Sequence, residues 1–353
     1  MLSEAKHLYS MSFNLQHHLN SIYSSPRKFA CTARTLKDYS IWQADFRAEL
    51  TRLLGLENHP PASCIAEHIQ TIDRDTYTEE KLSLDVGEGV QAPIYLLTPK
   101  QEPPYKPILV FHGHDPSAQY CMGNYPDEET ERINLETDNN YAKALVEVGY
   151  LVCVVEQRGM GERLSDVVKD IFSHSSCRHL SFFYQMHGRT LLGERIWDGM
   201  CAATWLLSRN DLIGGLGCTG QSGGGTTTLW LSALDERITT VVVSGYFNSF
   251  HGSILAMEHC ECNYVPHLLK LAEMGDIAAL IAPRPFCAIN GEKDDIYPVQ
   301  FAHEQFETVR RAYELHNASN ACQLSIHPGV HGYNNAMSKD WFDRQSPLPA
   351  EEG

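Results

Sequence analysis

Residues 220–224 read Gly220-Gln221-Ser222-Gly223-Gly224 and separate two segments of different character. The run before them, 213–218, predicts a short buried strand, and the run after them, 226–233, predicts a helix. A serine flanked by glycines at a strand-to-helix turn is typical of a nucleophile elbow, because the turn strains the serine backbone and leaves no room for a neighbouring Cβ. The pattern predicts a nucleophilic Ser222, which needs a base and an acid later in the chain.

Strands and helices alternate on both sides of this turn. Apolar runs predict buried strands at 108–111, 151–155, 239–243, 285–289 and 322–326, with helices at 141–148, 194–208 and from Val299 onward. This alternation predicts an α/β protein with a doubly wound, mostly parallel sheet. Leu82, Leu84 and Val86 alternate with polar residues before a glycine turn at 87–89, so we expect an antiparallel hairpin at one edge of the sheet.

The same pattern divides the chain into three parts. Residues 1–60 are expected to form an N-terminal helical extension whose best helix starts at Ser40, the first residue of a capping box, and ends at Gly55. Residues 61–340 are expected to form the catalytic domain, and residues 341–353 a C-terminal tail. The extension is expected to serve as scaffolding, and it could also mediate a homo-oligomer.

Two segments, 163–193 and 247–276, interrupt the alternation after the ends of strands. Ligands bind beyond the carboxyl ends of the strands in open α/β sheets, so these insertions are expected to form a lid or pocket wall. Four residues of this region are candidates for lining the pocket, although each could equally serve packing: Tyr246, Phe247, His251 and Tyr264.

The composition argues against several classes of function. The chain has 28 Lys and Arg against 44 Asp and Glu, a formal net charge of −16, so it lacks the basic surface that a nucleic-acid partner requires. No stretch approaches the roughly 18 apolar residues of a membrane span, and the first residues lack the apolar run of a signal peptide. The 11 cysteines are scattered and odd in number. We therefore expect a cytoplasmic protein with no membrane or nucleic-acid partner.

Acidic and histidine residues follow Ser222 after the last two predicted strands. The order serine, acid, histidine at successive strand ends is that of a Ser-His-Asp triad on an α/β sheet. We predict Asp294 as the acid, because Gly-x-x-Asp-x-x-x-Pro is the spacing in hydrolases of this type, with Asp295 as the alternative. His331 is the predicted base. His327 competes with it, but a histidine at a strand end is expected to pack or to cap.

The tetrahedral intermediate of acyl transfer needs backbone donors for its oxyanion. The N–H of Gly223, directly after the nucleophile, is the first predicted donor. The second should come from the loop after strand 108–111, where we choose the N–H of His114, with Asp115 as the alternative.

Two segments contain residues of metal-ligating type. His112 and His114 are two apart on a loop, and His259-Cys260-Glu261-Cys262 could bind zinc. No matching further ligands are evident in either case. We therefore predict no metal and no cofactor, and expect residues 259–262 to be buried in the insertion.

Further motifs carry a resemblance to known proteins: Arg158-Gly159-Met160-Gly161, residues 188–193 with Trp197-Asp198, and the segments 260–266, 280–285 and 291–298. Over residues 38–340 the chain resembles a bacterial group of α/β-hydrolases related to acetylxylan esterases and dienelactone hydrolases. The resemblance implies the α/β-hydrolase fold and a Ser/Asp/His esterase, carried here by Ser222, Asp294 and His331.

These patterns predict a serine hydrolase that cleaves a small carboxylic ester, of the acetyl-ester type, through an acyl-enzyme. One fold hosts many reactions, so a biosynthetic acyltransferase, lyase or cyclase remains an alternative. A prolyl-oligopeptidase-like peptidase also fits Gly-x-Ser-x-Gly-Gly. That class usually carries an upstream propeller, which about 100 residues cannot build.

Overall fold

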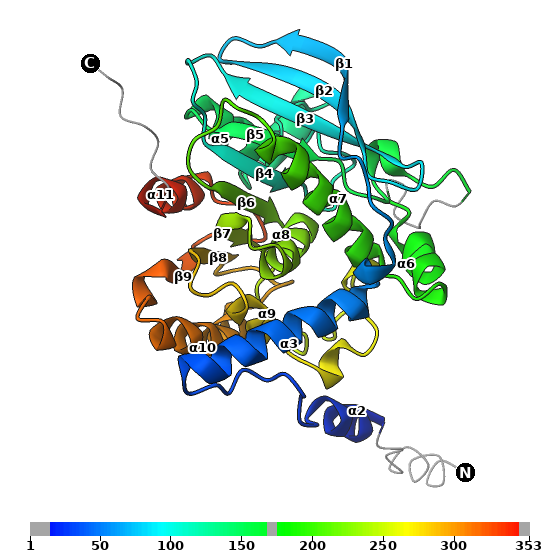
Figure 1. The fold of residues 1–353 in the computed structure, drawn as a ribbon, viewed down its shortest axis with the longest axis vertical. Helices are drawn as coiled ribbons and strands as arrows, with labels where there is room; N and C mark the ends of the chain where they lie inside the picture. Colours follow the sequence, from blue (N-terminus) through cyan, green and yellow to red (C-terminus); the bar gives the residue numbers. More distant parts are fainter. Residues whose placement is uncertain (1–14, 168–174, 346–353) are drawn as a thin grey trace, which may run out of the picture.

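Nine strands form one sheet in the described part of the computed structural model, which covers residues 15–167 and 175–345 (Figure 1). The order across the sheet is β1-β2-β3-β5-β4-β6-β7-β8-β9. The strands are β1 (Ala66–Asp73), β2 (Tyr77–Asp85), β3 (Gln91–Pro99), β4 (Pro107–Phe111), β5 (Leu151–Val155), β6 (Leu216–Gln221), β7 (Ile238–Ser244), β8 (Phe286–Gly291) and β9 (Cys322–His327).

The sheet is antiparallel at one end and parallel over the rest. β1, β2, β3 and β5 pair antiparallel, and β5, β4, β6, β7, β8 and β9 pair parallel. The predicted mostly parallel sheet with an antiparallel edge is therefore confirmed. Two details differ: β1 was not predicted, and β6 runs over 216–221 rather than 213–218, so it reaches the serine directly.

Helices cover both faces of the sheet (Figure 1). In β4, Leu109 and Phe111 belong to one apolar cluster, while Ile108 and Val110 belong to the other, as the alternation of a strand requires. The helices are α2 (Leu15–Tyr23), α3 (Leu36–Leu54), α4 (Glu128–Leu135), α5 (Tyr141–Glu147), α6 (Cys177–Met186), α7 (Leu191–Leu207), α8 (Gly223–Leu234), α9 (Met274–Ala279), α10 (Val299–Leu315) and α11 (Asn335–Gln345). None of these helices is long and apolar enough to cross a bilayer.

The long N-terminal helix α3 begins earlier than the sequence suggested. Its N-cap is Thr35, whose Oγ1 accepts the N–H of Asp38 at 3.1 Å, so the predicted start at Ser40 was wrong. Thr35 and Asp38 have the same i, i+3 capping spacing, and Ser40 instead donates its hydroxyl to the carbonyl of Leu36 within the helix. Gly55, with φ +78°, ends the helix as predicted.

The last described helix, α11, contains the beginning of the predicted C-terminal tail. Trp341 and Phe342 are buried against the sheet in the same apolar cluster as Tyr141 of α5. Residues 341–345 are therefore part of the packed structure, because two large aromatic side chains anchor them. The remainder of the predicted tail lies outside the described residues.

The two insertions contact each other beyond the ends of β5 and β7. The first contains α6, and the second contains the short helices η3 (Glu261–Asn263) and η4 (Leu268–Lys270). Arg178 of α6 pairs with Glu261 of η3 at 3.1 Å, and the amide of Gln185 donates to the carbonyl of Tyr264. Residues 168–174 of the first insertion lie outside the described residues.

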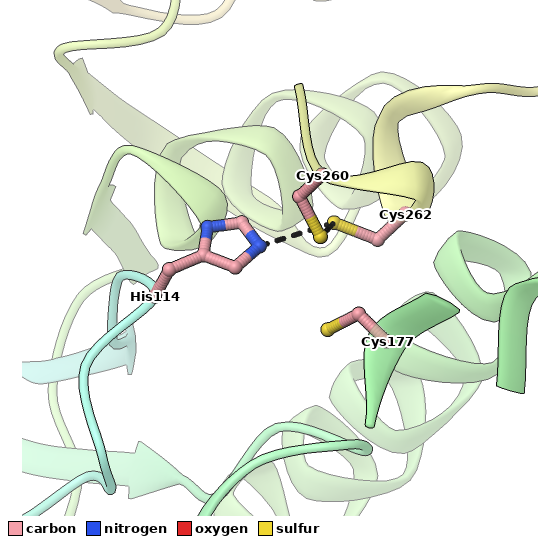
Figure 2. A group of neighbouring side chains, drawn as sticks. All are labelled: His114, Cys177, Cys260 and Cys262. Carbon is pink, nitrogen blue, oxygen red and sulfur yellow. Dashed lines mark hydrogen bonds between the residues drawn. The ribbon is translucent and has the colours of Figure 1, made fainter. Parts of the chain in front are cut away.

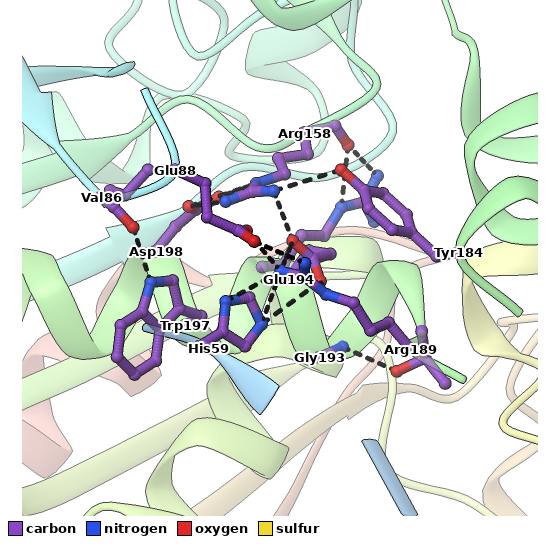
Figure 3. Close-up of polar contacts among 12 residues, drawn as sticks. His59, Val86, Glu88, Arg158, Tyr184, Arg189, Gly193, Glu194, Trp197 and Asp198 are labelled. Atoms are coloured by element: carbon purple, nitrogen blue, oxygen red, sulfur yellow. Dashed lines mark hydrogen bonds and ion pairs between the residues drawn. The ribbon is translucent and has the colours of Figure 1, made fainter. Parts of the chain in front are cut away.

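A buried charge network ties the first insertion to α7 and to the edge hairpin (Figure 3). Arg158 binds Asp198 through two parallel N–H···O bonds, each of 2.9 Å, and also pairs with Glu194. Arg189 bridges Glu194, at 2.6 Å, to Glu88 in the hairpin turn, at 2.9 Å. Arg158 comes from the Arg-Gly-x-Gly motif and Asp198 from the Trp-Asp motif. Together with Arg189 of the first insertion, these charged residues hold the insertion against α7 and the hairpin.

Candidate active site

Ser222 occupies a strained turn between β6 and α8. Its dihedral angles, φ +55° and ψ −117°, are costly for a residue with a side chain. A Cβ on Gly220 would lie 2.5 Å from the backbone of Gly224, and a Cβ on Gly224 would collide with the carbonyl of Phe111. The two glycines therefore let β4, β6 and α8 approach closely enough to hold the turn, as the sequence pattern predicted.

Asp294 and His331 meet beyond the ends of β8 and β9. Nδ1 of His331 donates to Oδ2 of Asp294 at 2.8 Å. Oδ1 of Asp294 accepts the N–H groups of Ile296 and Tyr297 at 2.9 and 3.0 Å. Burial raises the pKa of Asp294, but the hydrogen bond and charge of His331, with these two N–H donors, outweigh it and hold the pKa below its ordinary value.

The structure separates the two pairs of competing residues. The Asp295 side chain is exposed, whereas Asp294 is buried beside His331. His327 is buried, and its Nδ1 accepts the N–H of Gly329 at 3.2 Å, as expected of a histidine that caps a turn. Of the four candidates, all of which are described residues, only Asp294 and His331 share a hydrogen bond between a carboxylate and an imidazole.

The second ring nitrogen of His331 is occupied by Gln221, the residue before the serine. The Gln221 amide donates to Nε2 of His331 at 3.1 Å, which fits an imidazole that carries its proton on Nδ1. The hydrogen bonds of the described residues do not include one between Ser222 Oγ and His331. In this arrangement Gln221 occupies the ring nitrogen of His331 that a hydrogen bond from the serine would need.

Gly223 and His114, the residues whose N–H groups are the predicted oxyanion donors, pack together at the elbow through the His114 ring. Gly223 is the first residue of α8, where a backbone N–H has no acceptor within the helix. A Cβ on Gly223 would be 2.7 Å from Nδ1 and Cε1 of His114, so the loop after β4 packs directly on the start of α8. The alternative, Asp115, accepts the amide of Asn139 at 2.9 Å, and burial raises the pKa of its carboxyl.

A cavity of about 820 Å³ opens over this region. Its wall includes Ser222 and His331 together with residues of both insertions, and most of its side chains are polar. The lining residues are His114, Asp115, Asn134, Thr137, Asn139, Ser175, Arg178, Gln221, Ser222, Met257, Glu258, His259, Cys260, Glu261, Ile296 and His331. Burial, followed by the charges of His114 and His331, lowers the pKa of His259 to about 4, so this ring is neutral at neutral pH.

The four predicted pocket residues lie elsewhere, and none of them lines this cavity. Tyr246 and Phe247 are fully buried in the core below the second insertion, because the chain turns inward after β7. His251 is exposed, and its ring lies tilted against that of Tyr23 of α2, with ring centroids 4.8 Å apart. Tyr264 is half-buried and donates its hydroxyl to the carbonyl of Ile254.

Most residues of the cavity wall were not predicted from the sequence. Asn134, Thr137 and Asn139 follow β4 at the end of α4, at the carboxyl edge of the sheet. That position is the one signal that could have identified them, since ligands bind at this edge. Gln221 belongs to the Gly-x-Ser-x-Gly motif, but its contact with His331 depends on a side-chain orientation that the motif does not encode.

Four residues of metal-ligating type lie together beside the cavity: His114, Cys177, Cys260 and Cys262. Segment 259–262 was predicted to bind no metal because the sequence shows no matching ligands, and the structure brings Cys177 and His114 to it. A second group, His59 with Glu88 and Glu194, belongs to the arginine network described above.

The sheet, the elbow and the order of the strands define the α/β-hydrolase fold. A sequence profile of the Abhydrolase family matches residues 5–341, so the chain belongs to this family. It is similar to "Putative hydrolase YtaP" of Bacillus subtilis (strain 168), with 29% identity over 73% of this chain and 83% of that protein.

Many solved structures share the fold, and two of them illustrate the likeness at low sequence identity. One is titled a "putative acetyl xylan esterase" from Bacteroides fragilis NCTC 9343, with 16% identity, a TM-score of 0.74 and coverage of 97% of this chain and 92% of that chain. The other is a glucuronoyl esterase from Solibacter usitatus, with 12% identity, a TM-score of 0.64 and coverage of 92% and 97%.

Proposed function

We propose that this protein is a serine carboxylesterase whose triad is Ser222, His331 and Asp294. The observation that carries the proposal is the strained serine at the β6–α8 turn, which shares one cavity with an imidazole held by a buried carboxylate. Proteins keep backbone strain where function requires it, and a serine at such a turn is the nucleophile of this fold.

The proposed reaction is acyl transfer in two steps. His331 Nε2 takes the proton of Ser222 Oγ as the oxygen attacks the ester carbonyl, and Asp294 stabilises the resulting imidazolium. The N–H groups of Gly223 and His114 stabilise the oxyanion. His331 then protonates the leaving alcohol and activates the water that hydrolyses the acyl-enzyme. The depressed pKa of Asp294 keeps its carboxylate charged throughout.

The polar side chains among those that line the cavity support a hydroxylated substrate. Asn134, Thr137 and Asn139 line the same cavity as Glu258 and Glu261, and together they offer both donors and acceptors to ring hydroxyls. The titles of the two structural neighbours described above name a "putative acetyl xylan esterase" and a "Glucuronoyl Esterase". A small acyl ester of a sugar, such as an acetyl ester, is therefore the substrate class that we propose.

The test is active-site labelling combined with turnover. A fluorophosphonate should label the native chain at one residue, Ser222, and p-nitrophenyl acetate should be hydrolysed faster than a chromogenic peptide. Ser222→Ala should lose both signals, while Ser208→Ala, at an exposed serine on the C-cap of α7, should keep both.

The other outcomes separate the alternatives. Peptide cleavage without ester turnover would favour a peptidase. Labelling at Ser222 with neither activity, but with acyl transfer to an added alcohol, would favour a biosynthetic acyltransferase. A Ser222→Ala variant with native turnover would refute the proposal.

A further inference from the structure

Three cysteines and one histidine converge at the place where the two insertions meet the loop after β4 (Figure 2). Nε2 of His114 and the Sγ atoms of Cys177, Cys260 and Cys262 all lie within 4.8 Å of one another. The Cys260 and Cys262 sulfurs are 3.2 Å apart, and His114 Nε2 is 3.3 Å from the Cys262 sulfur. The imidazole points at the sulfur atoms, and Cys177 reaches them from α6.

We propose that these four residues bind a zinc ion in a Cys₃His site. Zinc takes four ligands tetrahedrally, with Zn–S of about 2.3 Å and Zn–N of about 2.0 Å, so neighbouring ligand atoms are about 3.5 to 3.8 Å apart. To reach these distances, the Cys260 and Cys262 sulfurs would separate by about 0.6 Å and His114 Nε2 would move about 0.2 Å from the Cys262 sulfur, while the widest pair would close by up to about 1 Å. Thiolates with one imidazole favour zinc over calcium, magnesium or manganese, which prefer oxygen ligands.

The charge balance around the cluster supports this assignment. Arg195 is buried, and its Nη2 donates to the Cys177 sulfur at 3.1 Å. Its other hydrogen bonds go to the carbonyl of Arg158, and within the described residues it forms no ion pair with a carboxylate. A buried guanidinium needs a negative partner. Three thiolates and one Zn²⁺ carry a net charge of −1, which Arg195 neutralises.

The surroundings match a structural rather than a catalytic metal site. Cys177 and Cys262 are buried in an apolar group with Met160 and Leu191. The amide of Asn263 lies 3.7 Å from the Cys262 sulfur, as a donor that orients a ligand would. Four protein ligands close the coordination sphere and leave no position for water or substrate, so the proposed ion stabilises the fold.

The ligands come from three segments that the sequence separates widely. Cys177 belongs to the first insertion, and Cys260 and Cys262 belong to the second. His114 belongs to the loop after β4, and its backbone N–H is a proposed oxyanion donor. Cys260 and His114 also line the cavity. A bound zinc would thus join both insertions to the loop after β4, because the deprotonated thiols of the insertions and the imidazole of His114 would be ligands of the same ion.

The test is the metal content of the untagged, full-length chain, purified with a reductant and without chelator. Elemental analysis should find about one zinc per chain. Cys177→Ser and Cys262→Ser should bind zinc at least about 100-fold more weakly. Cys121→Ser is the matched control, because this buried thiol donates to the Ala118 carbonyl outside the cluster, a bond that a serine hydroxyl can replace.

A second readout covers variants that fail to fold. Cobalt exchanged into the native chain should give the visible bands of a tetrahedral ion and a thiolate charge-transfer band in the near ultraviolet. A native chain with no metal and no cobalt spectrum would overturn the proposal, as would a disulfide between any two of the three cysteines. Metal content does not depend on turnover, so a zinc-loaded chain without esterase activity would refute the proposed function alone.

Discussion

Replacing Asp294 with asparagine tests the proposed triad most directly, because the surroundings of this carboxylate fix the orientation of an amide. Oδ1 accepts the N–H groups of Ile296 and Tyr297, so the amide oxygen must stay on that side. The amide NH₂ then faces Nδ1 of His331, which is 2.8 Å from Oδ2 in the native chain. His331 must therefore carry its proton on Nε2, and this tautomer cannot accept the proton of Ser222.

The expected loss is about 10⁴-fold in kcat, or about 5.5 kcal/mol of transition-state stabilisation. KM should change little, since Asp294 does not line the cavity. Initial rates with p-nitrophenyl acetate give both constants, and thermal unfolding of each variant shows whether it is folded. Asp295→Asn is the control: its side chain is exposed, so its kcat should stay within about twofold of native.

Two results would refute this reasoning. One is an Asp294→Asn variant that is folded and keeps more than about a tenth of native kcat, because a loss below 1.4 kcal/mol is too small for a wrong tautomer. The other is an Asp295→Asn variant that loses as much activity as Asp294→Asn, which would move the acid to the neighbouring position.

Two further substitutions test the frame around the site. Asp198→Asn should lower the free energy of unfolding by about 3–5 kcal/mol in urea titrations, since it leaves Arg163 buried without its carboxylate and Arg158 with Glu194 alone. Burial raises the pKa of Asp198, but Arg163 and Arg158 hold it below its ordinary value. The carboxylate therefore stabilises the folded chain fully above the pKa that it has in the unfolded chain, and this stabilisation is lost as the pH falls through the pKa that it has in the folded chain. The variant should lack this acid dependence, and an equally steep loss in acid would contradict the assignment. Gly223→Ala should lower kcat about 10²-fold, because its Cβ would meet the His114 ring and displace the loop that carries the second proposed oxyanion donor. A folded variant with native kcat would show that this contact does not position a donor.

The strand order made the candidate acid and base predictable. Parallel strands end at one edge of a sheet, so Asp294 after β8 and His331 after β9 had to lie near the serine after β6. The glycines of the elbow were predictable for a similar reason, since a turn between a buried strand and a helix excludes a Cβ. Both predictions depend only on the order of the strands and on the turn after β6, so they hold wherever this sheet forms.

The cavity wall could not be predicted in the same way. Tyr246 and Phe247 directly follow β7, and their aromatic character suits a pocket and a core equally well. Their burial depends on how the second insertion folds over them, and that insertion has only short 3₁₀ helices before α9. Without a periodic pattern, the sequence does not indicate which of its side chains face inward.

The cysteine cluster was missed for a reason that also bears on its role. Its ligands stand at positions 114, 177, 260 and 262, and only the fold brings the three segments together. Closing loops of this length is entropically costly, so contacts between the insertions need a favourable term of their own. Arg178–Glu261 is a partly exposed pair and supplies little. A shared metal would supply much more, and it would make the position of His114 depend on both insertions, so that a substitution far from the substrate could alter kcat.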